Sequence, residues 1–177
     1  KREGVLRGGI VYTVMANEGL TEALAREEIP LVRTPVGDKY VYAEMTERGW
    51  CLGGEPSGHV IFSKYQTTGD GLLTALEVLR VMLEEEKPLS ALVAPYVPYP
   101  EAQVNVRVLS PGEIVCRPSV TEAVRAAEAA LEGSGRVLVR ASGTEPVVRI
   151  LVEARETLLA RRLADRIEEI VKEEGRR

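Results

Sequence analysis

The sequence is poor in several residue types that build common sites. Aromatic residues make up 5% of the 177 residues, with a single Trp and a single Phe, and the chain has one His and two Cys. So few aromatics require a core built from Val, Leu, Ile and Ala. Cys51 and Cys116 form no CxxC pair, which excludes the usual cysteine-based metal sites. Their apolar neighbours predict buried thiols in a reducing, cytoplasmic compartment.

Long apolar runs and an excess of basic residues are also missing. No stretch approaches the roughly 18 consecutive apolar residues of a membrane helix, and the chain opens on no pattern typical of a signal peptide. The net charge of −4 argues against a general nucleic-acid surface, which needs clustered Lys and Arg. We therefore expect neither a membrane nor a nucleic acid as a partner.

Several well-known catalytic and metal-binding motifs are absent too. The sequence contains no GxxxxGKS or GxxxxGKT phosphate loop, no GxGxxG turn, no nucleophile elbow and no acidic cluster of the DxDxD type. Because nothing in the chain has the spacing of a ligand set for a hard cation, none of its residues is expected to bind a metal.

The residues that are present predict a globular protein whose first part, residues 1–87, is an α/β domain. Segments typical of strands alternate with segments typical of helices, which predicts a partial three-layer α/β/α domain with a mainly parallel sheet. Three or four strands are few for such a sheet, so the domain is expected to be truncated at its N-terminus. Strands are expected at residues 9–15, 31–34, 50–53 and 60–62, and helices at 17–28, at 38–48 capped by Asp38, and from Asp70 along the stripe Leu72, Leu76, Leu79 and Leu83.

The second part of the chain has a different order of elements. Residues 88–100 contain four prolines and two tyrosines, which predicts a semi-rigid linker. Residues 101–177 predict a small α+β domain whose antiparallel sheet packs on two helices. Strands are expected at residues 102–109, 137–139 and 147–152, and helices from a cap at Ser119 or Thr121 and over residues 157–173.

Two of these strands flank the sequence Arg-Ala-Ser-Gly-Thr-Glu-Pro at residues 140–146 and predict a hairpin. Symmetric pairing about the turn places Arg136 opposite Glu153 and Arg140 opposite Arg149. Like charges directly across two strands are destabilising. They become favourable when an anion lies between them.

The chemistry of this turn is that of a phosphate site. Arg140 and Arg149 carry planar guanidinium groups that match phosphate oxygens in pairs. Ser142 and Thr144 add hydroxyl donors, and Gly143 allows backbone N–H groups to turn toward an anion. The alternative interpretation is an ordinary polar turn with solvated arginines.

A second polar loop, Gly-Gly-Glu-Pro-Ser-Gly-His at residues 53–59, contains the only histidine. Glu55 accepts hydrogen bonds from hydroxyl groups, Ser57 donates and accepts them, and the glycines allow a ligand to approach closely. This set suits a sugar, with His59 as a proton carrier. The alternative is a glycine-rich turn with a surface histidine.

Together, GEPSGH and RASGTEP resemble the sugar-binding and phosphate-binding loops of the α-D-phosphohexomutase superfamily. The resemblance extends to YTVMANEGL, TPVGDKYV, TTGDGLLTAL and RASGTEPVVRILVEA, and it fits domains three and four of a four-domain enzyme. The longer strings look most like the bacterial branch that interconverts glucosamine 6-phosphate and glucosamine 1-phosphate. The phosphomannomutase/phosphoglucomutase branch tends to have a different phosphate loop from the one containing Gly143 and Glu145.

The resemblance implies a role for each motif residue. Glu55 and Ser57 would bind sugar hydroxyls, His59 would assist proton transfer near the reacting oxygen, and Lys39 would approach the ligand. Pro35 stands where many relatives have a basic residue, which removes a phosphate contact there. The non-transferring phosphate would be held by Arg140, Ser142, Gly143, Thr144 and Arg149.

The resemblance also implies what this chain lacks. The phosphoserine loop and the magnesium-binding aspartate loop of the family belong to its first two domains, which would lie upstream of Lys1. The chain would then supply substrate positioning only, with a phosphosugar and the missing N-terminal domains as partners and Mg²⁺ in the intact enzyme. The alternatives are a fragment from the phosphomannomutase/phosphoglucomutase branch, a non-catalytic phosphosugar-binding module, and a structural pair of domains without a ligand.

Overall fold

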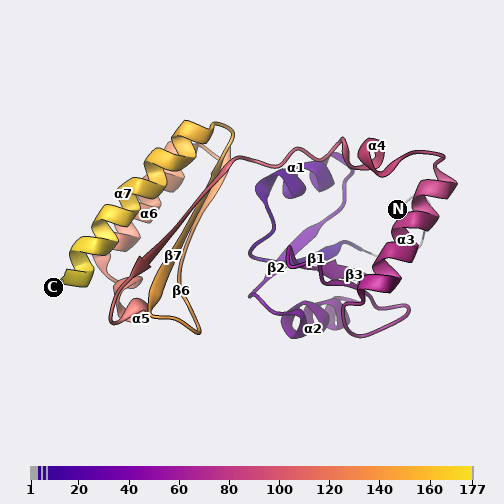
Figure 1. Cartoon of the computed structure of the whole chain (residues 1–177), viewed down its shortest axis with the longest axis horizontal. Coiled ribbons are helices and arrows are strands. Elements are labelled where there is room, and N and C mark those ends of the chain that lie inside the picture. The colour runs from indigo at the N-terminus through magenta and orange to yellow at the C-terminus, as the bar shows by residue number, and fades with distance from the viewer. Residues whose placement is uncertain (1–3, 5, 7, 177) are drawn as a thin grey trace. The chain divides into compact units, whose positions relative to one another are not determined.

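The fold is described from a computed structural model that covers residues 4, 6 and 8–176; residues 1–3, 5, 7 and 177 lie outside the description. The expected start of the first domain at residue 1 therefore falls outside it. The chain divides into two compact units, Lys1–Pro98 and Tyr99–Arg177 (Figure 1). The linker role expected for residues 88–100 stays a prediction.

The first unit is built on a four-stranded sheet with strand order β2-β1-β3-β4 (Figure 1). Its strands are β1 (Ile10–Thr13), β2 (Leu31–Thr34), β3 (Leu52–Gly54) and β4 (Val60–Phe62). β1 runs parallel to both β2 and β3, and β4 runs antiparallel to β3. The mainly parallel sheet expected from the sequence is thereby confirmed. Its carboxyl edge gathers the loops that follow β1, β2 and β3.

Four helices accompany this sheet: α1 (Glu18–Arg26), α2 (Asp38–Arg48), α3 (Gly71–Glu84) and α4 (Leu89–Val93). α1 and α2 lie on opposite sides of the sheet (Figure 1). This arrangement follows from the strand order, because two right-handed crossovers that leave β1 and β2 in opposite directions place their helices on opposite faces.

Two aspartates expected as helix caps behave differently. Asp70 caps α3, since its side chain accepts the Leu73 N–H at 2.9 Å. The prediction for Asp38 is wrong. Gly37 occupies the cap position of α2 with φ at 129°, and Asp38 is the first helical residue, whose Oδ1 accepts the Lys39 N–H at 2.8 Å.

The core of the first unit lies between the sheet and α2. Val11 and Ile61 point from the strands toward Val41 and Met45 of the helix, and all four are buried. Gly53 makes this close packing possible, because an added Cβ would lie 2.5 Å from Met45 Sδ and 2.6 Å from Val41 Cγ1. A glycine in β3 therefore sets how near α2 comes to the sheet.

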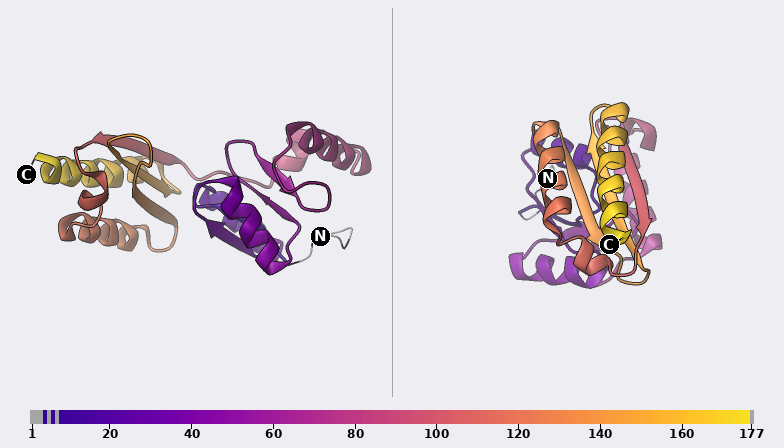
Figure 2. Two further views of the ribbon diagram at one scale, coloured as in Figure 1. Left: turned by 90° about the horizontal axis from the view of Figure 1, so that it is seen from below. Right: turned by 90° about the vertical axis from the view of Figure 1, so that its left-hand side faces the viewer.

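The second unit is a three-stranded antiparallel sheet with strand order β5-β7-β6. Its strands are β5 (Glu101–Arg107), β6 (Gly135–Ala141) and β7 (Val147–Ala154). The long helices α6 (Pro118–Leu131) and α7 (Thr157–Arg176) pack side by side on one face of this sheet and bury the largest apolar core of the described residues (Figure 2). This is the small α+β domain that the sequence predicts.

The connection between β5 and α6 corrects two predictions. A short helix, α5, runs from Pro111 to Ile114, and Cys116 after it is exposed rather than buried. Neither Ser119 nor Thr121 caps α6. The cap position is Arg117, and the helix begins with Pro118, whose fixed φ suits the first helical residue.

Candidate functional site

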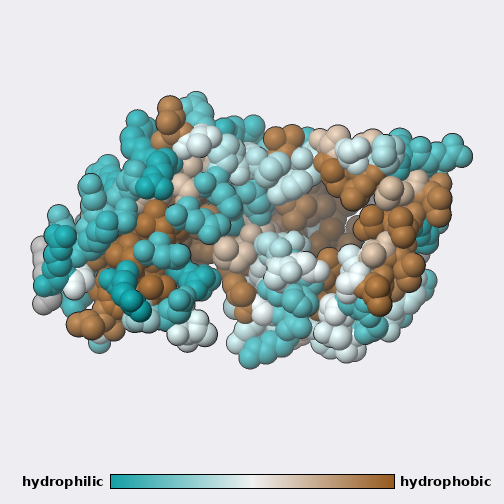
Figure 3. All heavy atoms as spheres, in the orientation of Figure 1, coloured by the Kyte–Doolittle hydropathy of each residue, from teal (hydrophilic) through white to brown (hydrophobic). Residues whose placement is uncertain are grey.

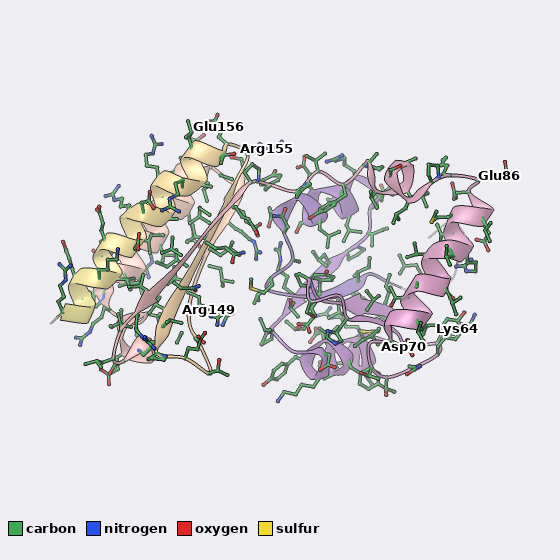
Figure 4. The ribbon with its side chains drawn as sticks, viewed as in Figure 1. Lys64, Asp70, Glu86, Arg149, Arg155 and Glu156 are labelled. Carbon is green, nitrogen blue, oxygen red and sulfur yellow. The ribbon has the colours of Figure 1, made fainter. Side chains whose placement is uncertain are left out.

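The hairpin of β6 and β7 has the register expected from its sequence. Arg140 lies opposite Arg149, and Arg136 lies opposite Glu153. β5 adds Asn105 to the row that holds the two arginines. This row lies on the face of the sheet away from α6 and α7, because the residues that alternate with it form the helix-covered core. Figure 4 shows Arg149 on β7 near the turn.

The two arginines of this row carry an unfavourable interaction in the absence of an anion. Burial lowers the pKa of Arg140, and the charge of Arg149 lowers it further. Arg149 Nη2 donates to Glu145 Oε2 at 2.6 Å. Its Nε is buried and meets no acceptor among the residues that the structure describes. The row therefore combines surplus positive charge with an unused donor, which is the requirement of an anion site.

The turn between the strands is held by its own backbone. The Ser142 N–H donates to the Val147 carbonyl at 2.9 Å, and the Val147 N–H donates to the Glu145 carbonyl at 2.8 Å. Ser142, Gly143 and Thr144 thus lie in one turn that begins one residue beyond Arg140. A Cβ added to Gly143 would meet no heavy atom of its surroundings within 4 Å, and its φ is not in the left-handed region. The conformation of the turn therefore does not require glycine at this position.

A buried ion pair fixes the far end of the hairpin. Arg136 Nε and Nη2 donate to the two carboxylate oxygens of Glu153 at 3.0 and 2.8 Å, and Glu153 is fully buried. Paired donors of this kind fix geometry as well as charge. The ion pair holds β6 and β7 in the one register that brings Arg140 and Arg149 together.

The second candidate loop connects β3 and β4 at the carboxyl edge of the first sheet. The Glu55 N–H donates to the His59 carbonyl at 2.9 Å and the Gly58 N–H to the Glu55 carbonyl at 3.1 Å. Ser57 Oγ lies 2.8 Å from His59 Nδ1, and Glu55 Oε1 lies 3.6 Å from the same nitrogen. The structure thus brings the carboxylate, the hydroxyl and the imidazole together, as the spacing in the sequence suggests.

Tyr12 is a residue near this loop that the sequence patterns do not identify. Its ring lies 3.5 Å from the position that a Cβ on Gly54 would take. Burial raises the pKa of the Tyr12 hydroxyl, and Tyr96 and Glu55 raise it further. Tyr12 alternates with Val11 on β1, so only the pairing of β1 with β3 reveals that it borders the loop.

Lys39 lies in the first turn of α2, at the carboxyl edge of the sheet that also bears Glu55. Its side chain is exposed, and its Nζ lies 4.8 Å from the centre of the Tyr40 ring. Pro35 is exposed in the connection from β2 to α2. The contact of Lys39 with a ligand stays a prediction.

In residues 4, 6 and 8–176 no group of three or more His, Cys, Asp or Glu side chains could hold a metal ion. Within the same part of the chain, no helix has the length and apolar character needed to cross a bilayer.

Known proteins and family models match this chain along almost its full length. Residues 1–99 match the family model of phosphoglucomutase/phosphomannomutase α/β/α domain III, and residues 104–170 match the C-terminal domain of the same family. The phosphoglucosamine mutases of Lachnospira eligens and Desulforudis audaxviator are 47% and 46% identical to it over 174 residues. That alignment covers 98% of this chain and 39% of each relative, so the chain spans well under half of their length.

Solved structures show the same fold. An N-acetylphosphoglucosamine mutase from Aspergillus fumigatus, in complex with GlcNAc-6P and magnesium, matches 97% of this chain with a TM-score of 0.81 at 23% identity, over 40% of its own length. An N-acetylglucosamine-phosphate mutase in its substrate complex matches 96% with a TM-score of 0.80 at 25% identity, over 39% of its own length. The chain therefore belongs to the phosphoglucomutase/phosphomannomutase family and carries its domain III and its C-terminal domain.

Proposed function

We propose that this chain is the substrate-positioning part of a phosphosugar mutase that interconverts glucosamine 6-phosphate and glucosamine 1-phosphate in the cytoplasm. The observation that carries the proposal is the row of Arg140 and Arg149 across the β6–β7 hairpin. A phosphate bound between them offsets their repulsion and provides an acceptor for the buried Nε of Arg149. Similarity to phosphoglucosamine mutases supports the choice of substrate.

In this proposal the loop at residues 53–59 and the turn at residues 140–146 bind different parts of the substrate. The turn after Arg140 holds the phosphate that is not transferred, with Ser142 and Thr144 as hydroxyl donors. Glu55 and Ser57 bind sugar hydroxyls. The two sets of residues belong to different units of the chain, and in this proposal the same residues bind the substrate in either of its orientations.

His59 is the residue proposed to move a proton near the reacting oxygen. When the Ser57 hydroxyl donates to Nδ1, the neutral ring carries its proton on Nε2 and can donate it to a ligand. Glu55 Oε1 lies 3.6 Å from Nδ1 on the same side of the ring as Ser57. Lys39 adds a positive charge at the same edge of the sheet.

The described residues do not form a binding group for the magnesium ion that the family employs. Phosphoryl transfer depends mainly on positioning and on electrostatic stabilisation of the transferred group. This chain supplies the positioning, and the phosphoryl donor and the metal site are proposed to belong to the remaining length of the protein.

The experiment compares thermal melts with and without glucosamine 6-phosphate in the parent chain, in Arg140→Gln and in Arg162→Gln. Arg162 is an exposed arginine on α7, on the opposite side of the sheet, and serves as the matched control. The ligand is expected to raise the melting temperature of the parent and of Arg162→Gln and to leave Arg140→Gln unchanged. Without ligand, Arg140→Gln is expected to melt about 1–3 °C higher, because repulsion from Arg149 is removed.

The two arms of this experiment separate the proposed site from non-specific anion binding. Equal ligand-induced shifts in the parent and in Arg140→Gln would place the phosphate elsewhere. Melts of the parent that do not respond to the ligand would overturn the proposal of a phosphate site in this turn.

A further inference from the structure

Asn105 lies in the same row of the second sheet as the two arginines. On β5 it pairs with Arg149, and Arg149 pairs with Arg140 on its other side. We call these three residues the arginine row. Residues that lie directly opposite each other in antiparallel strands have Cβ atoms about 4.5–5.5 Å apart. The Asn105 carboxamide is therefore within reach of the Arg149 guanidinium and of a ligand bound to it.

The side chain of Asn105 lies on the open face of the sheet. Ala102 and Val106 of the same strand are buried in the core that α6 and α7 cover, whereas Asn105 is exposed. Hydrophilic residues cover much of the second unit (Figure 3), so exposure alone does not indicate a site. Two further observations distinguish Asn105 from the other polar residues of this surface.

The first observation is the position of an asparagine inside a strand. Asparagine is depleted in β-strands, yet Asn105 stands between Val104 and Val106 in the seven-residue strand β5. Residues that contradict the preference of their own element are often found at functional sites. The arginine row gives such a reason for an asparagine at this position.

The second observation concerns hydrogen bonding. The chain contains two Asn and two Gln. Three of the four carboxamides form hydrogen bonds within their own segment: Asn17 with the Gly19 N–H, Gln66 with Asp70, and Gln103 with Glu101. For Asn105 no side-chain hydrogen bond is found among the described residues. Its carboxamide is thus an available neutral donor and acceptor in a row that otherwise consists of cations.

A phosphate in the row changes the hydrogen bonds that Arg149 can form. Arg149 Nη2 donates to Glu145 Oε2 at 2.6 Å, and its buried Nε meets no acceptor in the part of the chain that the structure describes. When a phosphate takes the place of Glu145, the five N–H groups of the guanidinium exceed what one phosphate accepts. The Oδ1 of Asn105 is the neutral acceptor of the row for a remaining N–H.

A carboxamide also suits this position better than a charged group. A third cation would repel Arg149, and a carboxylate would repel the phosphate. An asparagine accepts through Oδ1 and donates through Nδ2 without carrying a charge. It can therefore contact the arginine and the anion at the same time.

We propose that Asn105 is a further binding residue of the phosphate site, with its Oδ1 accepting a hydrogen bond from Arg149 and its Nδ2 donating to the bound phosphate. The site then includes residues from all three strands of the second sheet. This inference rests on the proposed function, because it requires a phosphate in the arginine row.

The first test follows the side-chain amide signals of the 177-residue chain by proton–nitrogen NMR while inorganic phosphate is added. The four carboxamides give four pairs of signals, and their comparison with Asn105→Asp identifies the pair from Asn105. These signals are expected to shift as phosphate binds, while those of Gln103 stay in place. Asn105 signals that do not move while the backbone signals of Ser142 and Thr144 respond to phosphate would overturn the inference.

The second test measures the Kd of inorganic phosphate and of glucosamine 6-phosphate in variants of two residues on β5. Gln103 is the matched control, because it is exposed on the same face about 7 Å from Asn105 and pairs with Leu151. Asn105→Ala is expected to raise both Kd values about tenfold, and Asn105→Asp to raise them further. Gln103→Ala and Gln103→Glu are expected to change them less than about threefold.

Arg140→Gln separates failure of this inference from failure of the proposed function. If the parent binds phosphate, Arg140→Gln does not, and Asn105→Ala binds as tightly as the parent, the phosphate site stands and Asn105 is not part of it. Equal weakening by Asn105→Asp and Gln103→Glu would indicate a general effect of charge on β5 and would also overturn the inference. A parent chain that binds neither ligand would overturn both proposals.

Melting temperatures without ligand distinguish binding from folding. Asn105 is exposed, so Asn105→Ala is expected to melt close to the parent. A loss of phosphate affinity that only accompanies a large fall in melting temperature would assign Asn105 a structural role and contradict the inference.

Discussion

Arg140 and Arg149 are the pair of residues on which the proposed phosphate site depends. Two guanidinium groups that face each other across a hairpin destabilise it when no anion lies between them. The β6–β7 hairpin keeps this register because other contacts stabilise it. The bidentate contact of Arg136 with the buried Glu153 is one of these contacts. Removing one partner of such a buried pair typically lowers the free energy of unfolding by about 3–5 kcal/mol. This is more than the repulsion between two like charges at a partly solvated site.

Gly53 allows a residue-scale prediction with a matched control. Gly53→Ala places a Cβ 2.5 Å from Met45 Sδ and 2.6 Å from Val41 Cγ1, so we expect it to lower the free energy of unfolding by about 2 kcal/mol. Gly71→Ala, at the start of α3, meets no heavy atom within 4 Å and is expected to raise it by about 0.5 kcal/mol. Urea titrations measure both. Equal effects of the two substitutions would show that α2 does not approach β3 this closely.

The role of a single residue could be predicted where one local interaction determines it. Asp70 caps α3 because it directly precedes the first helical residue and no other capping side chain competes. Asp38 did not act as a cap because Gly37, with φ at 129°, takes that position. Cys116 is exposed because it follows a helix of four residues that the sequence does not indicate. Competition between neighbouring residues is not visible in the sequence pattern.

At the scale of elements, the cap of α3 predicts a dependence on pH. The hydrogen bond from the Leu73 N–H lowers the pKa of Asp70 below its ordinary 3.8, with Gln66 contributing in the same direction. A carboxyl group with a lowered pKa stabilises the folded state above its unfolded pKa, and the stabilisation is lost as the pH falls through the lower folded value. Helical content of the parent is thus expected to fall below about pH 4.

The test follows helical circular dichroism and melting temperature from about pH 6 to about pH 2 in the parent and in two variants. Asp70→Asn retains a capping side chain without the charge, so its melting temperature is expected to depend less on pH than that of the parent. Asp70→Ala removes the cap and is expected to melt lowest at neutral pH. A parent and an Asp70→Asn variant with the same pH profile would show that the carboxylate does not contribute in the way described.

The elements of the hairpin could be predicted because the turn is short and both strands alternate. Symmetric pairing then fixes every cross-strand partner, and the expected register from Arg136 to Arg149 is confirmed. The pairing of β5 with β7 could not be predicted, because these strands are joined through α5, α6 and β6. Asn105, which lies in the arginine row, was missed for that reason.

The exposure of the α3 stripe, formed by Leu72, Leu76, Leu79 and Leu83, could not be predicted either. Its spacing gives the helix and its apolar side, but whether an apolar side is buried depends on what packs against it. The same limit applies to Tyr12, which borders Glu55 only through the pairing of β1 and β3.

The molecule as a whole spans 39% of the length of relatives that are phosphoglucosamine mutases. We predict that this chain alone does not convert glucosamine 6-phosphate to glucosamine 1-phosphate, even with Mg²⁺, because we propose that the phosphoryl donor belongs to the remaining length of the protein. A coupled assay measures the conversion, with the full-length protein as the positive control. Turnover that co-purifies with the 177-residue chain and disappears in Arg140→Gln would contradict this prediction.

Glu145 affects how long a phosphate stays bound at the proposed site. It forms an ion pair with Arg149 at 2.6 Å within the turn proposed to bind phosphate. A phosphate that binds Arg149 must displace this carboxylate. The carboxylate can pair with the guanidinium again when the phosphate dissociates. An internal competitor of this kind weakens binding of the phosphate at the proposed site and shortens the time for which it stays bound.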